Sequence, residues 1–434
     1  MRQARRRRPS GAVLGLLSFS TLAACCASAQ AQGIIMQGVG TVNRAMAGVG
    51  TAAPVDAAGA LYRNPATMSA FRSSEVSVGA ELLLMTENLS STFPLAGSGS
   101  TDAEAGASLI PSVGWVHRLD DSPLTLGLGM YGVAGFKSNY PSSLTNPVLA
   151  PQPNGLGRVF AELQVFEVAP AASLQLTPEL SVGFSPILAI GSLDAMPLFL
   201  APPDDANGDT AFTYRDGMGT RYHYGGAVQL GVYYDPGGDW AFGSSIKSPT
   251  WFEDFRFFTT DEVGAPRLDK LDLNLPMIVS AGCSYRGFEN VLWATDVRYV
   301  DYKNTNGFRP AGYTAFGNAT GLGWDNIFAV STALQIQTTE RLVMRLGYSY
   351  QENPISDANT FFNIASPLIL EHIVSVGASL RVSRNATLHA AYLHAFESSN
   401  TGPWVLPGIG AVPGSSVTST ISADALSAGF TVKY

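Results

Sequence analysis

Side chains that could perform catalysis or bind a metal are few and scattered in this sequence. The histidines are His117, His223, His372, His389 and His394, and no two have the helical spacing of a metal-binding pair. On one strand, His389 and His394 would point to opposite faces because they are five residues apart. No local motif places a nucleophile beside a base and an orienting group. We therefore predict no metal site, no cofactor and no enzyme activity.

Apolar side chains suited to hydrophobic ligands gather in two long connections. One contains the segment WFEDFRFF at 251–258, and the other contains MPLFL at 196–200. Exposed apolar clusters usually mark binding surfaces, so we predict that substrate contacts this set. Its members are Leu198, Phe199, Leu200, Trp251, Phe252, Phe255, Phe257 and Phe258. The alternative is an aromatic belt at a membrane interface, although Phe is less typical of belts than Trp and Tyr.

Segments of alternating apolar and polar residues must position these side chains. Between Glu75 and Leu84, Val, Ala and Leu occupy one face, and Glu, Ser and Gly occupy the other. Residues 341–351 and 374–382 repeat the pattern, as do residues 271–286, which we predict to be one strand with Leu273 and Leu275 facing lipid. A period of two with one apolar and one polar face is typical of strands that separate lipid from a polar interior.

Short and long connections alternate between these segments. Outer-membrane barrels have short periplasmic turns, long outer loops and an even number of strands. The short turns are at 120–123, 177–179, 235–239, 286–290, 338–340 and 383–385, and the long loops are at 86–105, 137–159, 196–218, 251–267, 303–323, 352–368 and 397–419. We therefore predict an all-β fold, a transmembrane antiparallel β-barrel of about 14 strands over residues 74–434. A soluble β-sandwich is the alternative, but its connections need not alternate in length.

The N-terminus predicts export. Residues 1–31 contain five Arg before Pro9, an apolar run over 12–24 and small residues up to Ala31, as a secretory signal peptide does. The alternative is a lipoprotein signal in which Cys25 is acylated. Removing this segment leaves 21 of the 26 basic residues against 34 acidic ones, a net charge of −13, which disfavours nucleic acid as a partner. No apolar run reaches 20 residues, so a helical membrane protein is excluded.

The segment from Gly33 to Phe71 is rich in Gly and Ala and keeps neither a strand nor a helix period. It ends in the triplet Asn64, Pro65 and Ala66, where proline favours a turn. Because its small side chains bury little apolar area, the segment needs a container. We therefore predict that residues 32–73 form a plug inside the barrel.

The segment GVGTVNRAMAGVGTAAPVDAAGALYRNPATMSAF, which ends at Phe71, resembles the plug of the FadL/TodX family. This family comprises outer-membrane transporters for long-chain fatty acids and other hydrophobic compounds. Similar segments follow along nearly the whole chain: YGVAGF at 131–136, LNLPMIVSAGCSYR at 273–286, WDNIFAVSTAL at 324–334 and RLGYSYQENPI at 345–355. The resemblance implies passive uptake of hydrophobic molecules, which are captured by outer loops and released laterally past the plug, with Asn64, Pro65 and Ala66 at the gate.

A kink in the third strand opens the wall of family members toward the membrane. The corresponding strand here carries glycine at positions 127, 129, 132 and 135. Glycine within a strand marks a bulge or a close approach, so we predict a lateral exit at Gly132 and Gly135. Tight packing against the plug is the alternative explanation of these glycines.

The sequence departs from the fatty-acid transporters of the family at the site that binds the carboxylate of the fatty acid. Those members use basic residues on the fifth strand and just before the tenth, but residues 190–199 and 321–326 contain no Lys or Arg here. Arg221, Arg298 and Arg345 are the candidate substitutes. The substrate class stays open between fatty acids and neutral hydrocarbons or aromatics.

The expected partners follow from a location in the outer membrane. They are hydrophobic small molecules, membrane lipid and lipopolysaccharide, and the barrel-assembly machinery, which would recognise the last strand ending in the aromatic Tyr434. We expect a monomer that crosses the membrane many times. The alternatives are a barrel enzyme acting on lipid, a surface adhesin and a general porin, which a plug would block.

Overall fold

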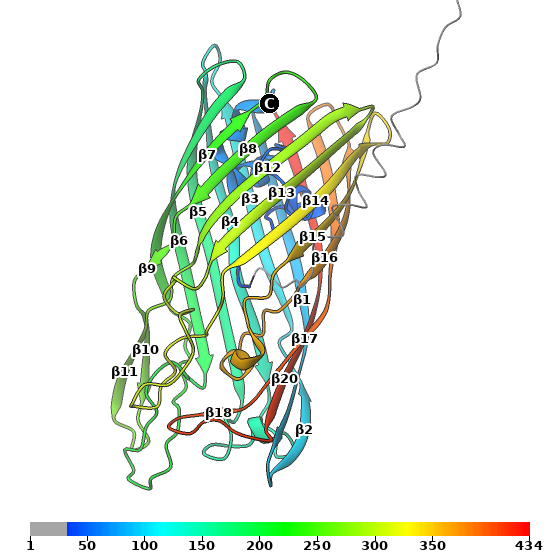
Figure 1. Cartoon of the computed structure of the whole chain (residues 1–434). Helices are drawn as coiled ribbons and strands as arrows, with labels where there is room; N and C mark the ends of the chain where they lie inside the picture. Colours follow the sequence, from blue (N-terminus) through cyan, green and yellow to red (C-terminus); the bar gives the residue numbers. More distant parts are fainter. Residues whose placement is uncertain (1–32) are drawn as a thin grey trace, which may run out of the picture.

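The computed structural model describes residues 33–434. The predicted signal peptide at 1–31 and the alternative acylation site at Cys25 lie outside the described residues. Figure 1 shows a tall barrel of tilted strands, with short turns and the C-terminus at one end and the long connections at the other.

Fourteen antiparallel strands form the wall, which confirms the predicted fold class. They are β1 (Glu75–Phe93), β3 (Ala107–Arg118), β4 (Leu124–Tyr140), β5 (Val159–Gln175), β6 (Leu180–Met196), β7 (Tyr222–Tyr234), β8 (Trp240–Lys247), β12 (Met277–Phe288), β13 (Val291–Asp301), β14 (Ile327–Gln337), β15 (Leu342–Gln351), β16 (His372–Arg381), β17 (Ala386–Gly402) and β20 (Ser416–Lys433). The first strand pairs with both β3 and the last strand, so the sheet closes on itself.

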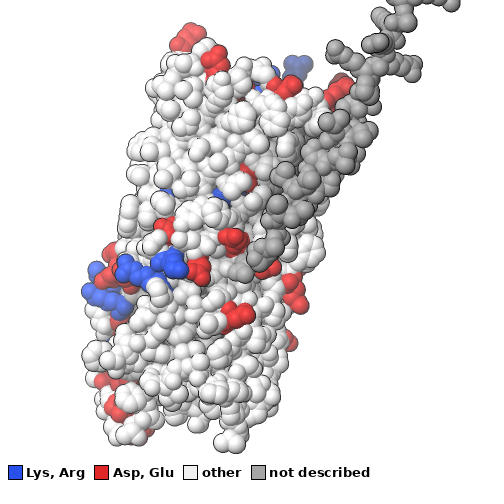
Figure 2. Space-filling view, in the orientation of Figure 1, with Lys and Arg blue, Asp and Glu red and all other residues white. Residues whose placement is uncertain are grey.

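The wall is apolar outside and polar inside. On β1, Leu82 and Leu84 are 39% and 42% exposed, whereas Glu75 and Glu81 are 2% and 5% exposed. This order is the reverse of that in a water-soluble protein and suits strands that face lipid. In Figure 2 the surface over the strands is largely free of charged side chains, which gather mainly toward the long connections and the opposite rim.

The long connections carry the remaining elements of the outer end. These are β2 (Gly97–Asp102), β9 (Trp251–Phe252), β10 (Phe255–Thr260), β11 (Pro266–Leu271), β18 (Val405–Leu406), β19 (Gly410–Ala411), η2 (Pro147–Leu149) and η3 (Asp357–Asn363). The hairpins β10–β11 and β18–β19 project beyond the wall (Figure 1). None of the described helices is long and apolar enough to cross a membrane.

The predicted single strand over 271–286 is wrong in its first part. Wall strand β12 begins at Met277, and Leu273 and Leu275 are buried inside, with 7% and 3% of their surface exposed. Pro276 precedes Met277 and has no N–H for the strand ladder, so the paired strand starts only after it.

The N-terminal segment, residues 33–71, lies within the barrel (Figure 1). It contains α2 (Thr41–Ala45), α3 (Ala57–Arg63) and the 3-10 helix η1 (Pro65–Ala70). The Asp56 side chain caps α3 by accepting from the Gly59 N–H. Asn64 ends α3 and also caps η1, whose first residue is Pro65, where a missing N–H costs nothing.

Candidate functional site

Asn64 fastens the N-terminal segment to itself and to the wall. Its Nδ2 donates to the carbonyl oxygens of Thr51 and Val232, each at 2.9 Å, and its Oδ1 accepts from the Ala66 N–H at 3.1 Å. The side chain is fully buried. One amide therefore joins two turns of the segment to strand β7.

Wall glycines make room for this triplet. A Cβ on Gly231 would lie 2.0 Å from Asn64 Oδ1, and a Cβ on Gly183 would lie 2.2 Å from the Ala66 nitrogen. A Cβ on Gly243 would lie 2.0 Å from the Thr51 oxygen. We call these three glycines, together with Asn64, Pro65 and Ala66, the Asn64 contact. Only glycine on the wall permits backbone and amide to approach so closely.

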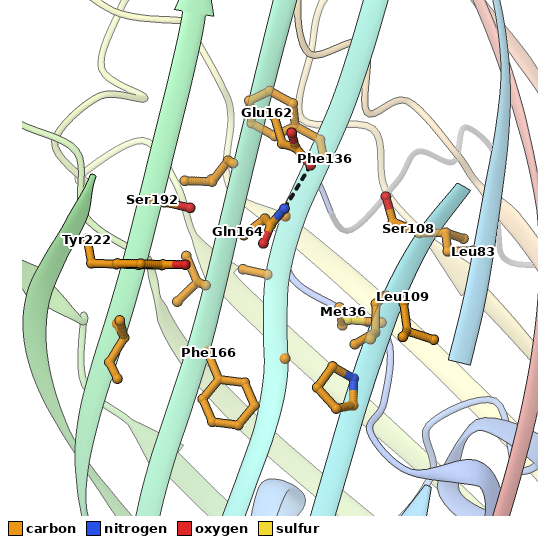
Figure 3. Close-up of a pocket in the computed structure, with 18 of the residues that line it drawn as sticks. Met36, Leu83, Ser108, Leu109, Phe136, Glu162, Gln164, Phe166, Ser192 and Tyr222 are labelled. Carbon is orange, nitrogen blue, oxygen red and sulfur yellow. Dashed lines mark hydrogen bonds between the residues drawn. The ribbon is translucent and has the colours of Figure 1, made fainter. Parts of the chain in front are cut away.

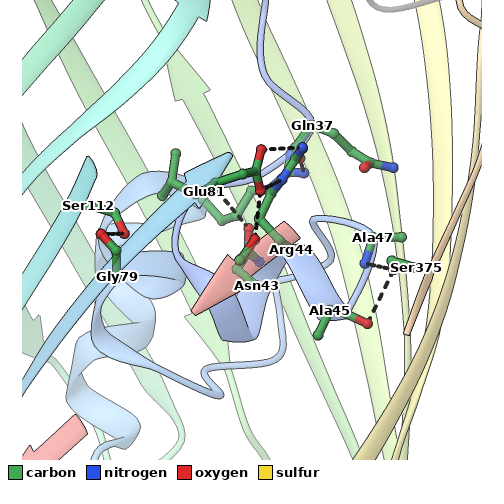
Figure 4. Close-up of polar contacts among 12 residues, drawn as sticks. Gln37, Asn43, Arg44, Ala45, Ala47, Gly79, Glu81, Ser112 and Ser375 are labelled. Atoms are coloured by element: carbon green, nitrogen blue, oxygen red, sulfur yellow. Dashed lines mark hydrogen bonds and ion pairs between the residues drawn. The ribbon is translucent and has the colours of Figure 1, made fainter. Parts of the chain in front are cut away.

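Polar side chains of the wall hold other parts of the segment. Asp296 accepts from the N–H groups of Gly50 and Thr51 at 2.8 and 3.0 Å. Ser375 donates to the Ala45 oxygen at the end of α2 and accepts from the Ala47 N–H just after it (Figure 4). Arg44 Nε lies 2.6 Å from the Glu81 carboxylate. These bonds satisfy backbone groups that would otherwise be buried without partners.

A buried ion pair crosses the interior beside α3. Lys247 Nζ lies 2.5 Å from Glu167 Oε1 and 2.7 Å from Oε2, although their strands β8 and β5 are not neighbours in the wall. The ammonium is also 5.8 Å from the centre of the Tyr62 ring. The pair thus ties two distant strands across the side of the N-terminal segment.

The wall is interrupted between β3 and β4. Their pairing runs from Arg118 and Thr125 only as far as Ser112 and Tyr131. Beyond that point, residues 107–111 of β3 pair with β1 among the described residues, and the pairing of β4 with β5 shifts register between Gly132 and Ala134. We call the space between residues 107–111 and residues 132–136 the lateral gap.

The N-terminal segment occupies the strand edge that β3 leaves free. The Met36 N–H donates to the Val133 oxygen at 2.8 Å, and the Gly135 N–H donates to the Ile34 oxygen at 3.1 Å. Residues 34–36 therefore supply hydrogen-bond partners to the backbone N–H and C=O groups of β4 at the lateral gap. Inside a membrane such groups need a partner within the protein.

A cavity of about 590 Å³, here called the wall cavity, passes through the lateral gap (Figure 3). Leu83 and Leu163 line it from the interior. Leu109 and Tyr222, whose side chains are 71% and 68% exposed on the outer surface, line it from the outside. Its few polar groups include Gln164, which donates to Glu162 at 2.7 Å. The cavity is thus mainly apolar and reaches both faces of the wall.

A second space of about 100 Å³, the inner cavity, lies deeper in the barrel. It shares Met36, Leu83, Met85 and Gly135 with the wall cavity, so the two adjoin beside the start of the N-terminal segment. Together they have the volume that small-molecule sites usually occupy.

The glycines of β4 differ in their surroundings. A Cβ on Gly132 would lie 2.7 Å from Ile110 Cγ2, across the lateral gap. On Gly135 it would lie 2.6 Å from the Leu163 oxygen, and on Gly127 it would lie 2.5 Å from Met68 Sδ of the N-terminal segment. Packing against the segment therefore explains Gly127, whereas Gly132 and Gly135 line the wall cavity. Their role as an exit stays a prediction.

The predicted loop residues do not form one surface. Leu198, Phe255 and Phe257 are buried in the interior, with 3%, 1% and 5% exposed. Trp251 and Phe258 are exposed at 57% and 59%.

The other three members of the set are half-buried. Phe199 packs against Tyr214 and Tyr313, with ring centroids 5.5 and 5.8 Å apart, and Phe252 packs against Phe255 at 5.5 Å. None of the eight predicted residues lines either described cavity, and their contact with substrate remains a prediction.

The three candidate arginines also line neither cavity. The Arg221 guanidinium carbon stands 4.3 Å over the Phe258 ring, and Arg345 donates to Gln335 at 2.8 Å. Arg298 is buried, with 3% exposed. The basic side chain that lines the inner cavity is Arg44, which is already paired with Glu81.

Apart from Gly132 and Gly135, sequence reasoning missed the residues that line the cavities. A signal was present in Leu82, Leu83, Leu84 and Met85, where an unbroken apolar run replaces the alternation of β1. Such a run indicates that the interior face is also apolar. Among residues 33–434, no group of three His, Cys, Asp or Glu side chains is arranged to hold a metal.

Comparisons with known proteins agree with this architecture. Residues 20–434 match the family model described as outer membrane protein transport protein (OMPP1/FadL/TodX). The comparison with curated proteins gives no match.

Among solved structures, the Pseudomonas putida toluene transporter TodX has a TM-score of 0.69 and 16% identity, covering 92% of this chain and 99% of that one. A Pseudomonas aeruginosa FadL homologue has a TM-score of 0.72 and 12% identity, with the same coverage. The Ralstonia pickettii toluene transporter TbuX has a TM-score of 0.67 and 16% identity, again with the same coverage. At these identities the likeness supports the fold.

Proposed function

This chain belongs to the OMPP1/FadL/TodX family of outer-membrane transport proteins, and from that premise we propose that it carries small hydrophobic molecules passively into the outer membrane through the lateral gap. The family is one of transporters and channels for hydrophobic compounds. The observation that carries the proposal is the wall cavity, because apolar side chains line it on both the interior and the lipid side.

The proposed path begins at the outer loops. The loops that carry the eight predicted residues, at 198–200 and 251–258, capture substrate, which then enters the barrel and leaves between Ile110 and Gly132. Burial of apolar surface supplies about 25 cal/mol per Å2, so transfer from water to the cavity and then to lipid needs no energy source or cofactor. The N-terminal segment closes the straight route, which disfavours a general porin.

The Asn64 contact is the proposed support of the gate. It anchors the far part of the N-terminal segment to the wall, while residues 34–36 cover the strand edge at the lateral gap. A displacement of residues 34–36 alone would widen the passage and leave the pairing between neighbouring wall strands intact, while the Val133 oxygen and the Gly135 N–H would lose their partners in the segment.

Neutral aromatic hydrocarbons fit the interior better than carboxylates do. Arg44, the basic residue of the inner cavity, is committed to Glu81. A carboxylate entering there would be desolvated without a free cation to pair with, which is costly. The toluene transporters TodX and TbuX, which share the fold, are consistent with this substrate class.

The remaining proposals concern assembly and partners. The barrel-assembly machinery would recognise the last strand, whose Tyr434 hydroxyl accepts from Trp115 Nε1 at 2.6 Å. The outer rim contacts lipopolysaccharide, and the protein acts as a monomer without enzyme activity.

The test is uptake by cells at matched outer-membrane levels. Gly132→Val places methyl groups against Ile110 in the lateral gap, so uptake of radiolabelled toluene should fall several-fold. Gly238→Val, at a turn where a Cβ meets nothing within 4 Å, is the matched control and should transport normally. Equal uptake by both variants would mean that substrate leaves by another route.

A further inference from the structure

Two buried carboxamides belong to residues that line the inner cavity, and they lack their full set of partners beneath its surface. Gln37 is 4% exposed, and neither its Oε1 nor its Nε2 has a hydrogen-bond partner among the described residues. Gln351 is also 4% exposed, and its Oε1 likewise has no partner there. Both line the inner cavity. Buried polar groups without partners are rare in folded proteins, so these two require an explanation.

The rest of the cavity cannot satisfy them. Its other walls are mainly aliphatic, including Ile35, Leu370 and Leu393. Arg44, the charged residue of the lining, directs its Nε and one Nη to the Glu81 carboxylate, each at 2.6 Å. Figure 4 shows the Gln37 side chain directed away from this ion pair.

We propose that Gln37 and Gln351 select substrates with one neutral hydrogen-bonding head group, such as an alcohol or phenol, on an otherwise apolar body. The proposal rests on the proposed function, because it names the substrate class of the same path. The head group would occupy the inner cavity, and the apolar body would extend into the wall cavity through the shared residues Met36, Leu83 and Met85.

The donors and acceptors match such a head group. A hydroxyl donates to a carboxamide oxygen and accepts from a carboxamide N–H, so it satisfies both kinds of unpartnered atom. A hydrocarbon satisfies neither kind. A carboxylate only accepts, so it could accept from the Gln37 Nε2 but would leave both carboxamide oxygens without a donor, and it would lose its hydration.

The experiment measures binding of radiolabelled decan-1-ol, decane and decanoate to the purified full chain by equilibrium dialysis in detergent. Chambers without protein correct for partition into micelles. Wild-type protein should bind decan-1-ol about tenfold more tightly than decane after this correction, the difference that one or two net hydrogen bonds produce. Decanoate should bind more weakly than decan-1-ol.

The double variant Gln37→Leu/Gln351→Leu keeps similar side-chain volumes and removes the polar atoms. It should bind decan-1-ol and decane equally, with decane bound as well as in the wild type. Gln175→Leu, beside the turn between β5 and β6, is the matched control and should keep the wild-type preference.

The outcomes separate this inference from the proposed function. Equal binding of decane and decan-1-ol by the wild type, or a preference that persists in the double variant, would mean that the carboxamides bind water only and would overturn the inference. Tighter binding of decanoate would also overturn it. Failure of the wild type to bind decane at all would contradict the proposed function itself.

Discussion

Replacing Asn64 with Ala should release the N-terminal segment from the wall while the barrel stays intact. The change removes both donors to Thr51 and Val232 and the acceptor for Ala66. The wall itself does not depend on this amide. Val232 on β7 stays paired with Val182 on β6 and with Ser244 on β8.

The expected magnitude follows from the buried groups that lose a partner. Each net hydrogen bond is worth about 1 kcal/mol, and leaving a buried donor or acceptor unpaired costs about 1–3 kcal/mol. Three contacts in a fully buried position therefore amount to about 2–4 kcal/mol. The ratio of docked to undocked segment should therefore fall by a factor of about 30 to 1,000.

Trypsin offers a direct assay, because Arg44 and Arg63 are the cleavage sites within the N-terminal segment. They are 6% and 2% exposed when the segment is docked, so cleavage there reports undocking. Asn64→Ala should be cut much faster than the wild type, with unchanged heat-modifiable mobility of the barrel. Asn88→Ala, which removes a surface hydrogen bond to Asp102, is the matched control.

Two results would refute this reasoning. Cleavage at the wild-type rate would show that Asn64 does not hold the segment. Loss of heat-modifiable mobility in Asn64→Ala, with the Asn88 variant normal, would show that Asn64 is needed to build the barrel rather than to fasten its contents.

Three further predictions follow from other contacts. Phe430→Asp puts a charge on the lipid face and should leave unfolded protein in the periplasm, visible as lower outer-membrane levels on a blot. Lys247→Met leaves Glu167 buried without its partner and should lower barrel stability by about 3–5 kcal/mol, measured as an earlier heat-modifiability transition that Lys247→Met/Glu167→Gln largely restores. Burial and nearby Glu75 raise the pKa of Asp56, in the N-terminal segment, from 3.8 to about 7. The docked segment, in which Asp56 is buried, therefore holds this proton more tightly than an undocked segment would. Docking should weaken as pH rises from about 4 to 7. Trypsin cleavage should show this dependence and lose it in Asp56→Asn; equal pH profiles would contradict it.

The wall was predictable because two independent signals agree along the sequence. The period of two shows which face of each strand is apolar. The alternating lengths of the connections show which end of each strand lies at the outer side of the barrel. The prediction failed at Leu273 and Leu275, where the alternation continues although Pro276 ends the ladder. Local pattern alone does not show where a paired strand begins.

The candidate site was less predictable because it depends on contacts between distant segments. The lateral gap exists because residues 34–36 replace β3 beside Val133 and Gly135, about a hundred residues away. Helix α3 has only seven residues and is held by wall side chains such as Gln229, so its own periodicity was too short to reveal it. The Gly132 signal was visible in the sequence, but its neighbour Ile110 was not.

A reversible crosslink across the lateral gap tests the central claim most directly. A Cβ on Gly132 lies 2.7 Å from Ile110 Cγ2, so the two Cβ atoms are at most about 4.2 Å apart, within disulfide range. The variant Ile110→Cys/Gly132→Cys, with Cys283→Ala to remove the free thiol, should take up toluene slowly when oxidised and at the rate of the Cys283→Ala parent after reduction. Fast uptake by the fully crosslinked protein, at equal outer-membrane levels, would contradict lateral release between β3 and β4.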